Sequence, residues 1–139
     1  MIRHATIGDV PALVEMGREF WAMSPHRTMG EFTPEAVSAM LVFLIADDKG
    51  LVLVNGEGAI GGMMAPIYFD PSKMMIEELF FWSHRGGREL LREFTERSKA
   101  MGASCVFLSA LENERLPAVN RLFAHAGFRP LERRFVMEF

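Results

Sequence analysis

Two adjacent carboxylates, Glu77 and Glu78, interrupt the otherwise apolar run "KMMIEELFFWS", which the pattern of large apolar residues predicts to be a strand over 73–83. Neighbouring side chains of a strand point to opposite faces, so one carboxylate is expected in solvent and the other paired, hydrated or placed in a cleft. Partial burial would raise the pKa of that carboxyl group toward the range of a general base. The alternative is an ion pair with a nearby Arg or Lys, with the second glutamate solvated.

The same strand runs into a pair of glycines, Gly86 and Gly87, bracketed by Arg85 and Arg88. The spacing of apolar residues in "RGGRELLREFTERSKAMG" predicts a helix over 85–102. The free N–H groups and positive dipole of a helix N-terminus attract phosphate, and the two arginines would add charge-assisted contacts. The alternative is a tight turn between strand and helix. The nucleotide-binding pattern G-x-x-x-x-G-K-[ST] does not occur in the chain.

The rest of the chain supplies the elements that would position these residues. An Asn-Gly turn at 55–58 joins the two strands of a predicted hairpin. The full predicted order is a strand over 2–7, helices over 8–23 and from 33, a hairpin over 51–69, the strand over 73–83, the helix over 85–102, a strand over 104–111, a helix over 115–127 and a closing strand over 128–139. We therefore expect one α/β domain of the α+β type over 1–139, with helices on both faces of a mixed sheet.

Composition narrows the classes of function. A formal net charge of −3 disfavours a nucleic-acid-binding face, and no apolar run reaches the length of a membrane span. The lone Cys105 lies in a predicted buried strand, and no export signal precedes the first strand, so we expect a cytosolic protein. No set of His, Cys, Asp and Glu has the spacing of a metal site. Twelve Phe and 11 Met are typical of an adaptable core, and the alternative is an apolar cleft or a homodimer contact.

The order of elements, with "IRHATIGDVPALVEM" near the start and "NRLFAHAGF" near the end, resembles the GNAT superfamily of acyl-CoA-dependent N-acyltransferases over nearly the whole chain. In that family two parallel strands splay apart and the pantetheine arm of acyl-CoA lies in the gap. The resemblance implies that backbone groups of four residues pair with pantetheine: Leu79, Phe80, Phe81 and Trp82. It implies a pyrophosphate loop formed by Arg85, Gly86, Gly87, Arg88 and Glu89, and a CoA contact at Asn113.

The sequence departs from the family pattern in three places. The family loop reads R/Q-x-x-G-x-G/A; with Gly87 in the last position, Arg85 replaces a glycine and Trp82 replaces the leading Arg or Gln. The loop is also shorter than usual. Many members have a tyrosine on the last helix as general acid, and Phe123 stands at the matching position. The single tyrosine, Tyr68, is far from that position in sequence.

The resemblance implies transfer of an acetyl group from acetyl-CoA to a primary amine of a small molecule or peptide. Glu78, which adjoins Leu79, or Glu77 would take the amine proton, and the loop containing His26 and Phe32 would shape the acceptor pocket. A thiol with a pKa near ~8.5 can leave without a general acid, so Phe123 does not preclude turnover. The alternative is a GNAT-fold protein that binds acyl-CoA or a protein partner without catalysis.

Overall fold

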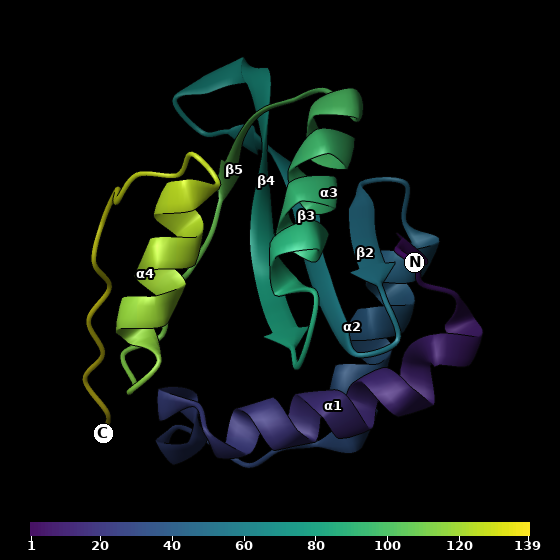
Figure 1. The fold of residues 1–139 in the computed structure, drawn as a ribbon, viewed down its shortest axis with the longest axis vertical. Helices are drawn as coiled ribbons and strands as arrows, with labels where there is room; N and C mark the ends of the chain where they lie inside the picture. Colours follow the sequence, from purple (N-terminus) through teal and green to yellow (C-terminus); the bar gives the residue numbers. More distant parts are fainter.

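The computed structural model describes all 139 residues, and its five-stranded sheet has the strand order β1-β2-β3-β4-β5. The strands are β1 (Arg3–His4), β2 (Gly50–Val54), β3 (Gly58–Ile67), β4 (Asp70–Ser83) and β5 (Ala103–Phe107). The helices are α1 (Val10–Ala22), α2 (Pro34–Ala46), α3 (Gly87–Ala100) and α4 (Leu116–His125), with 3-10 turns at Ile7–Asp9 and Pro25–Thr28 (Figure 1). None of these helices combines the length and the apolar character needed to cross a bilayer.

The sheet is mixed, as predicted. Strands β1 to β4 pair antiparallel in sequence order, and β4 pairs parallel to β5 through the crossover helix α3. The predicted Asn-Gly turn connects β2 to β3, where Gly56 has φ of +89°, a conformation that favours glycine. Parallel pairing is thereby confined to the pair of strands that flanks the candidate site.

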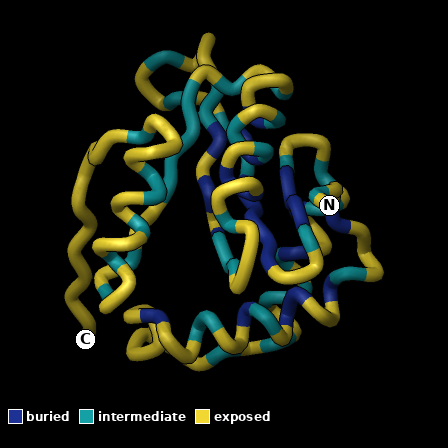
Figure 2. The backbone as a smooth tube through the Cα atoms, in the orientation of Figure 1, coloured by how far each residue is buried: buried dark blue, intermediate teal, exposed yellow.

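Helices cover both faces of the sheet, which confirms the predicted architecture. On one face α1 and α2 pack against β2, β3 and Phe80 through a cluster that includes Leu13, Leu41 and Leu44. On the other face α3 packs through Leu90, Leu91 and Phe94. Figure 2 shows that the buried residues concentrate in β2, β3 and β4 and in the helix faces toward them. Helix α4 has no fully buried residue, so it covers β5 only loosely.

A β-bulge interrupts the pairing of β3 with β4 at the acidic pair. Gly61 pairs with Phe80 and Gly62 with Glu78, so Leu79 is an extra residue without a partner on β3. A Cβ atom on Gly62 would collide with the backbone carbonyl oxygen of Glu77 and would lie 3.0 Å from the ring of Phe94. Glycine at this position therefore lets β3 approach the bulged segment closely.

The structure contradicts the predicted closing strand over 128–139, and it shows that the strand around Cys105, predicted to be buried, is β5 with no fully buried residue. Residues 129–139 are extended but belong to no sheet, and all of them are exposed. The alternation of apolar and polar residues reports strand propensity, whereas a strand also needs a partner for its backbone groups. In this chain no partner is within reach, because the segment follows the outer side of α4 (Figure 1).

We predict that Gly62→Ala destabilises the fold. The added methyl group must displace the backbone of β4 at the bulge, and overpacking of this kind typically costs about 1–3 kcal/mol in the free energy of unfolding. Urea denaturation at equilibrium measures the difference. Gly30→Ala is the control, because nothing lies within 4 Å of the Cβ position at Gly30. Equal stability of the two variants would contradict the close approach at the bulge.

Candidate active site in the gap between β4 and β5

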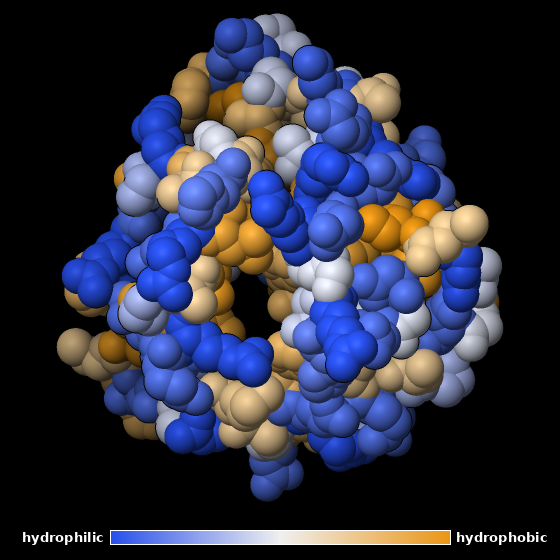
Figure 3. Space-filling view, viewed as in Figure 1, coloured by the Kyte–Doolittle hydropathy of each residue, from blue (hydrophilic) through white to orange (hydrophobic).

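The two parallel strands separate at the acidic pair. The last paired residues are Glu77 of β4 and Phe107 of β5, after which β4 continues to Ser83 while the other chain segment turns away toward α4. The β5-facing edge of β4 over residues 78–83 therefore has no strand partner. Figure 3 shows a hollow in this part of the molecule, with apolar side chains on much of its wall.

Glu78 lies where the gap begins. Its carboxylate Oε2 accepts a hydrogen bond from the backbone N–H of Ser109 at 3.1 Å, across the point where the strands diverge. The side chain is buried, and burial raises the pKa of this carboxyl group to about 7, an effect that the Ser109 hydrogen bond opposes and the charge of Glu77 reinforces. The pKa of Glu78 thus lies in the range where a carboxyl group can both accept and release a proton near neutral pH.

Glu77 has a different environment, because it lies on the other face of the sheet. Its cross-strand partner is Met63, which packs against the core under α1 and α2, whereas Glu78 pairs with Gly62 above Phe94. Glu77 is exposed and makes no ion pair. The opposite orientation of the two carboxylates agrees with the sequence prediction, and the buried member of the pair is Glu78.

In the four residues after the acidic pair, the backbone borders the gap, whereas most of the side chains pack against the two faces of the sheet. The rings of Phe80 and Trp82 stack at 4.2 Å between centroids on the face under α1, where Trp82 lies against Gly17. Phe81 packs on the opposite face with the cluster under α3. Leu79, the bulged residue, is the exception, since its side chain is 51% exposed.

The loop between β4 and α3 is held in a fixed shape by contacts to its backbone. The side chains of Asn55 and Ser83 both donate hydrogen bonds to the carbonyl oxygen of Arg85, at 2.9 and 3.0 Å. Gly86 follows with φ of +71°, and a Cβ atom there would meet the Asn55 amide nitrogen at 2.5 Å. The sequence pattern identified the Asn-Gly turn, but nothing in it signalled that the Asn55 side chain would also hold this loop.

The backbone N–H groups of residues 85–89 have no hydrogen-bond acceptor within the protein. They include the first N–H groups of α3, which has no side-chain cap at its start. The predicted pyrophosphate residues therefore lie in one loop with free donors at a helix N-terminus, as an anion site requires.

Helix α1 contacts the same loop. His84 Nε2 lies 2.9 Å from the carboxylate of Glu19, and the ring of His84 lies 5.3 Å from the ring of Phe20. The backbone N–H of His84 also donates to the carbonyl oxygen of Glu57 at 2.9 Å. The loop is thus fixed from α1 on one side and from the β2–β3 turn on the other.

A cavity of about 570 Å³ adjoins the loop on the side of the N-terminus, and Arg85 and Gly86 line it. Arg92 adds a second positive charge, but three glutamates share the wall: Glu57, Glu89 and Glu93. The cavity as a whole is therefore not positively charged. Arg88 is exposed at the start of α3 and lies outside this cavity.

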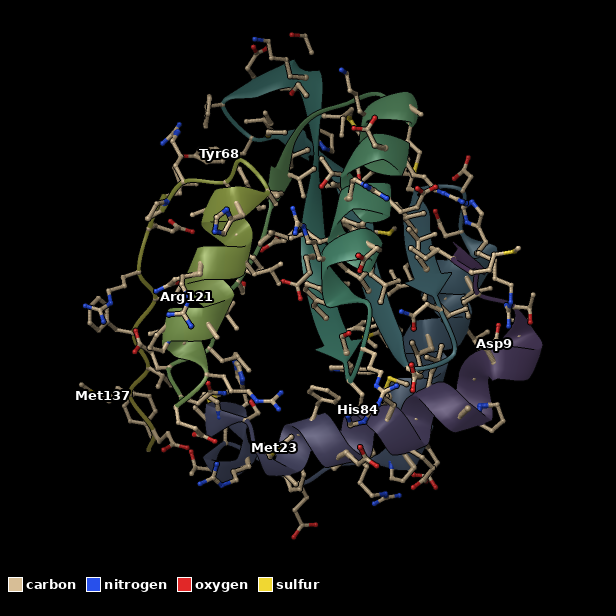
Figure 4. All side chains as sticks on the ribbon, viewed as in Figure 1. Asp9, Met23, Tyr68, His84, Arg121 and Met137 are labelled. Atoms are coloured by element: carbon tan, nitrogen blue, oxygen red, sulfur yellow. The ribbon has the colours of Figure 1, made fainter.

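The predicted acceptor residues make local contacts. His26 Nδ1 lies 2.9 Å from the Ser24 hydroxyl, and Phe32 lies 5.9 Å from the ring of Trp21 and beneath the guanidinium of Arg18. Both belong to the connection between α1 and α2, which lies below the hollow where Met23 is labelled (Figure 4). No contact brings either side chain to Glu78, so their role in an acceptor pocket stays a prediction.

The residues at the last helix have structural partners. Asn113 Oδ1 accepts a hydrogen bond from the Arg115 N–H at 3.0 Å, which forms the turn into α4. Phe123 is half-buried and packs near Phe128 and the core under α3. Tyr68 is 92% exposed at the β3–β4 turn, at the opposite end of β4 from His84 (Figure 4). No tyrosine hydroxyl therefore reaches the gap.

The similarity of this chain to known proteins lies in its fold. No protein-family model and no curated protein sequence matches the chain. A proposed acetyltransferase from Agrobacterium tumefaciens superposes with a TM-score of 0.75 at 19% identity, covering 100% of this chain and 99% of that one.

Two further solved structures are similar over the same extent. Glucosamine-6-phosphate N-acetyltransferase from Arabidopsis thaliana has a TM-score of 0.69 at 14% identity, with coverage of 100% of this chain and 97% of that one. A GNAT family acetyltransferase from Staphylococcus aureus has a TM-score of 0.65 at 15% identity, with coverage of 100% and 98%. With its splayed parallel strands, bulged β4 and glycine loop at α3, the chain has the fold of the GNAT acetyltransferases.

Proposed function

We propose that this protein is an N-acetyltransferase that transfers the acetyl group of acetyl-CoA to a primary amine of a small molecule or peptide. The observation that carries the proposal is the buried carboxyl group of Glu78, with a pKa of about 7, at the start of the gap between β4 and β5. We also propose that the protein is cytosolic, as the sequence predicts.

The backbone around the gap fits an acyl-CoA molecule. The unpaired edge of β4 after Glu78 offers N–H and C=O groups to the amides of pantetheine, and the free N–H groups of residues 85–89 offer donors to the pyrophosphate. When bound there, acetyl-CoA supplies an activated acetyl group as a thioester. Backbone N–H groups near the Leu79 bulge would stabilise negative charge that develops on the thioester oxygen.

Glu78 would accept the proton that the amine must lose before it can attack. Free alkylamines are protonated at neutral pH, with a pKa near ~10, so a base is needed. The Ser109 N–H holds the carboxylate in place. Phe123 cannot donate a proton to the departing sulfur, so we expect the thiol to leave as its anion and to be protonated by water.

Binding of acyl-CoA without catalysis is the second candidate function. The observations that favour it are the side chains of Trp82 and Arg85 at positions where the family loop has other residues, and the absence of a tyrosine hydroxyl from the gap. Release of free thiol that depends on an added amine separates the two functions, because a binding protein would take up acetyl-CoA without turnover.

The first experiment is a calorimetric titration of the protein with acetyl-CoA, with free CoA and adenosine as controls. Micromolar binding of both CoA forms, and weaker binding of adenosine, is the expected result. An absence of binding at millimolar acetyl-CoA would remove both candidate functions and leave the glycine pair as a structural turn.

We predict that Glu78→Gln lowers kcat by about 10²–10⁴-fold, the usual contribution of a general base, while the affinity for acetyl-CoA is retained. In the parent protein kcat/KM should rise with pH through a pKa near 7, and the variant should lack this step. The matched control is Glu77→Gln, which removes the exposed neighbour and should leave turnover near that of the parent. An unchanged kcat for Glu78→Gln would contradict the assignment.

The raised pKa of Glu78 also predicts a pH dependence of stability that needs no substrate. Between its ordinary pKa of 4.5 and about 7, the folded state keeps a proton that the unfolded chain has released, so the free energy of unfolding falls as pH rises. Gln cannot ionise, so from pH 4.5 to 8 Glu78→Gln should gain up to about 3 kcal/mol relative to the parent. Urea denaturation of both proteins across this range measures the gain, and a constant difference would contradict burial of the carboxyl group.

We predict that Gly87→Asp weakens the binding of acetyl-CoA at least tenfold without unfolding the protein. Aspartate in the first turn of a helix is favourable for the helix, but here its charge would lie beside the bound pyrophosphate. Calorimetry measures the affinity and circular dichroism the fold. Ala39→Asp on the exposed side of α2 adds the same charge away from the loop and should bind normally. Equal affinity of the two variants would refute the loop assignment.

A further inference from the structure

We propose that the acceptor of this protein is a primary amine carried on an apolar body, an arylalkyl or alkyl amine rather than a polyamine or an amino sugar. This substrate class rests on the proposed function, because only a transferase has an acceptor. The observation behind it is the second half of α1, where an apolar stripe continues beyond the part of the helix that the sheet covers.

One face of α1 is apolar along the whole helix, but only its first half is fully buried. Leu13, Val14 and Gly17 are buried against the sheet and α2. Phe20 and Trp21 continue the same stripe at a spacing of three and four residues from Gly17, and both are only half-buried. Two large aromatic side chains therefore remain partly open at the end of the stripe.

The open end of the stripe lies beneath the hollow between β4 and β5. The sheet covers α1 as far as Gly17, against which Trp82 of β4 lies. The ring of Phe20 lies 5.3 Å from the ring of His84 in the loop after β4, and Met23, which follows the helix, is 45% exposed. Figure 4 labels both His84 and Met23 below the hollow. The stretch of α1 between these two points, which carries Phe20, therefore forms the floor of the hollow.

The charged side chains on this part of α1 already have partners. Arg18 Nε lies 3.4 Å from the carboxylate of Glu15, and the carboxylate of Glu19 lies 2.9 Å from His84 Nε2. No carboxylate of α1 is left to pair with a second ammonium group of an acceptor. A charged group placed against Phe20 would lose hydration without gaining a partner, whereas an apolar group would bury surface there.

The wall opposite the floor is apolar too. Leu79, the bulged residue, is 51% exposed at the unpaired edge of β4. Figure 3 shows apolar side chains on the inner wall of the hollow and hydrophilic ones around its mouth. Pantetheine would bind the backbone of the β4 edge, so the aromatic floor on α1 is left for the acceptor.

The distance from the carboxyl group to the floor sets the size of the acceptor. Four residues of β4 separate Glu78 from Trp82, which lies over α1, and a strand of this length spans roughly 13 Å. The side chain of Phe20 takes up part of this distance. An amine whose nitrogen reaches Glu78 would therefore place a body the size of a phenyl ring or a hexyl chain over the floor.

The first test compares two amines of equal length in an assay of thiol release from acetyl-CoA. Hexylamine and 1,5-diaminopentane differ only in a terminal methyl group that the diamine replaces with an ammonium group, and 2-phenylethylamine is the aromatic probe. We expect kcat/KM for hexylamine and 2-phenylethylamine to exceed that for 1,5-diaminopentane at least tenfold. Equal or faster acetylation of the diamine would overturn the substrate class while leaving the transferase activity established.

The second test changes the floor. Phe20→Gln should raise KM for 2-phenylethylamine about tenfold, with kcat and the affinity for acetyl-CoA within twofold of the parent, and Phe20→Leu should restore most of the loss. Phe43→Gln is the control, because Phe43 is exposed on α2 and should not contact the acceptor. An unchanged KM for Phe20→Gln would overturn the proposal. So would an equal loss of affinity for acetyl-CoA, since Phe20 would then act on the loop through His84.

The third test separates the substrate class from catalysis, because it needs no turnover. The protein is titrated calorimetrically with 2-phenylethylamine and with 1,5-diaminopentane in the presence of excess free CoA. Binding of 2-phenylethylamine that Phe20→Gln weakens, in a protein that transfers no acetyl group, would refute catalysis and support the apolar amine site. No binding of 2-phenylethylamine, or tighter binding of the diamine, would overturn the inference.

Discussion

The separation of β4 from β5 is the constraint on which the rest of the structure depends. Two parallel strands that remained paired would bury the backbone of residues 78–83 in a ladder and leave no gap. Here the pairing stops at Glu77 and Phe107, and the side chain of Glu78 bridges the opening strands by accepting the N–H of Ser109. One hydrogen bond thus replaces the ladder at the point of divergence, and beyond it the strand edge is free.

The bulge at Leu79 and the burial of Glu78 are two consequences of the same local geometry. The extra residue changes which side chains face which core: Glu78 lies above Phe94 and Gly62, whereas Phe80, two residues later, lies in the core under α1 and α2. In a regular strand these two residues would share a face. Because the carboxyl group is enclosed with few polar partners, its charged form is disfavoured and its pKa rises to about 7.

The loop at the start of α3 shows how a degenerate motif can retain its geometry. The Arg85 side chain stands where the family pattern has glycine, yet the backbone keeps the left-handed turn at Gly86 and leaves the following N–H groups free. Asn55 and Ser83 stabilise that turn through the Arg85 carbonyl oxygen. What an anion would meet in such a loop is backbone, so the shape of the turn matters more than the identity of each side chain.

The sequence by itself determined the order of the elements, the mixed sheet, the Asn-Gly turn, the glycine start of α3 and the opposite orientation of Glu77 and Glu78. Each of these follows from local chemistry: apolar periodicity, turn residues and the alternation of side chains along a strand. The prediction of a closing strand over 128–139 was wrong. A strand needs a neighbouring backbone to pair with, and the local sequence pattern does not show whether one is present.

Only the tertiary structure decided which glutamate is buried, since burial of Glu78 depends on Ser109, which is 31 residues away in sequence. The contacts of Asn55 with Arg85 and of Glu19 with His84 were likewise decided by packing between distant segments. The free edge of β4 has the same origin, because it exists only through the path that the chain takes after Phe107. The sequence pattern specifies which element each segment can form, whereas the packing of distant segments determines which charged side chain is buried away from water.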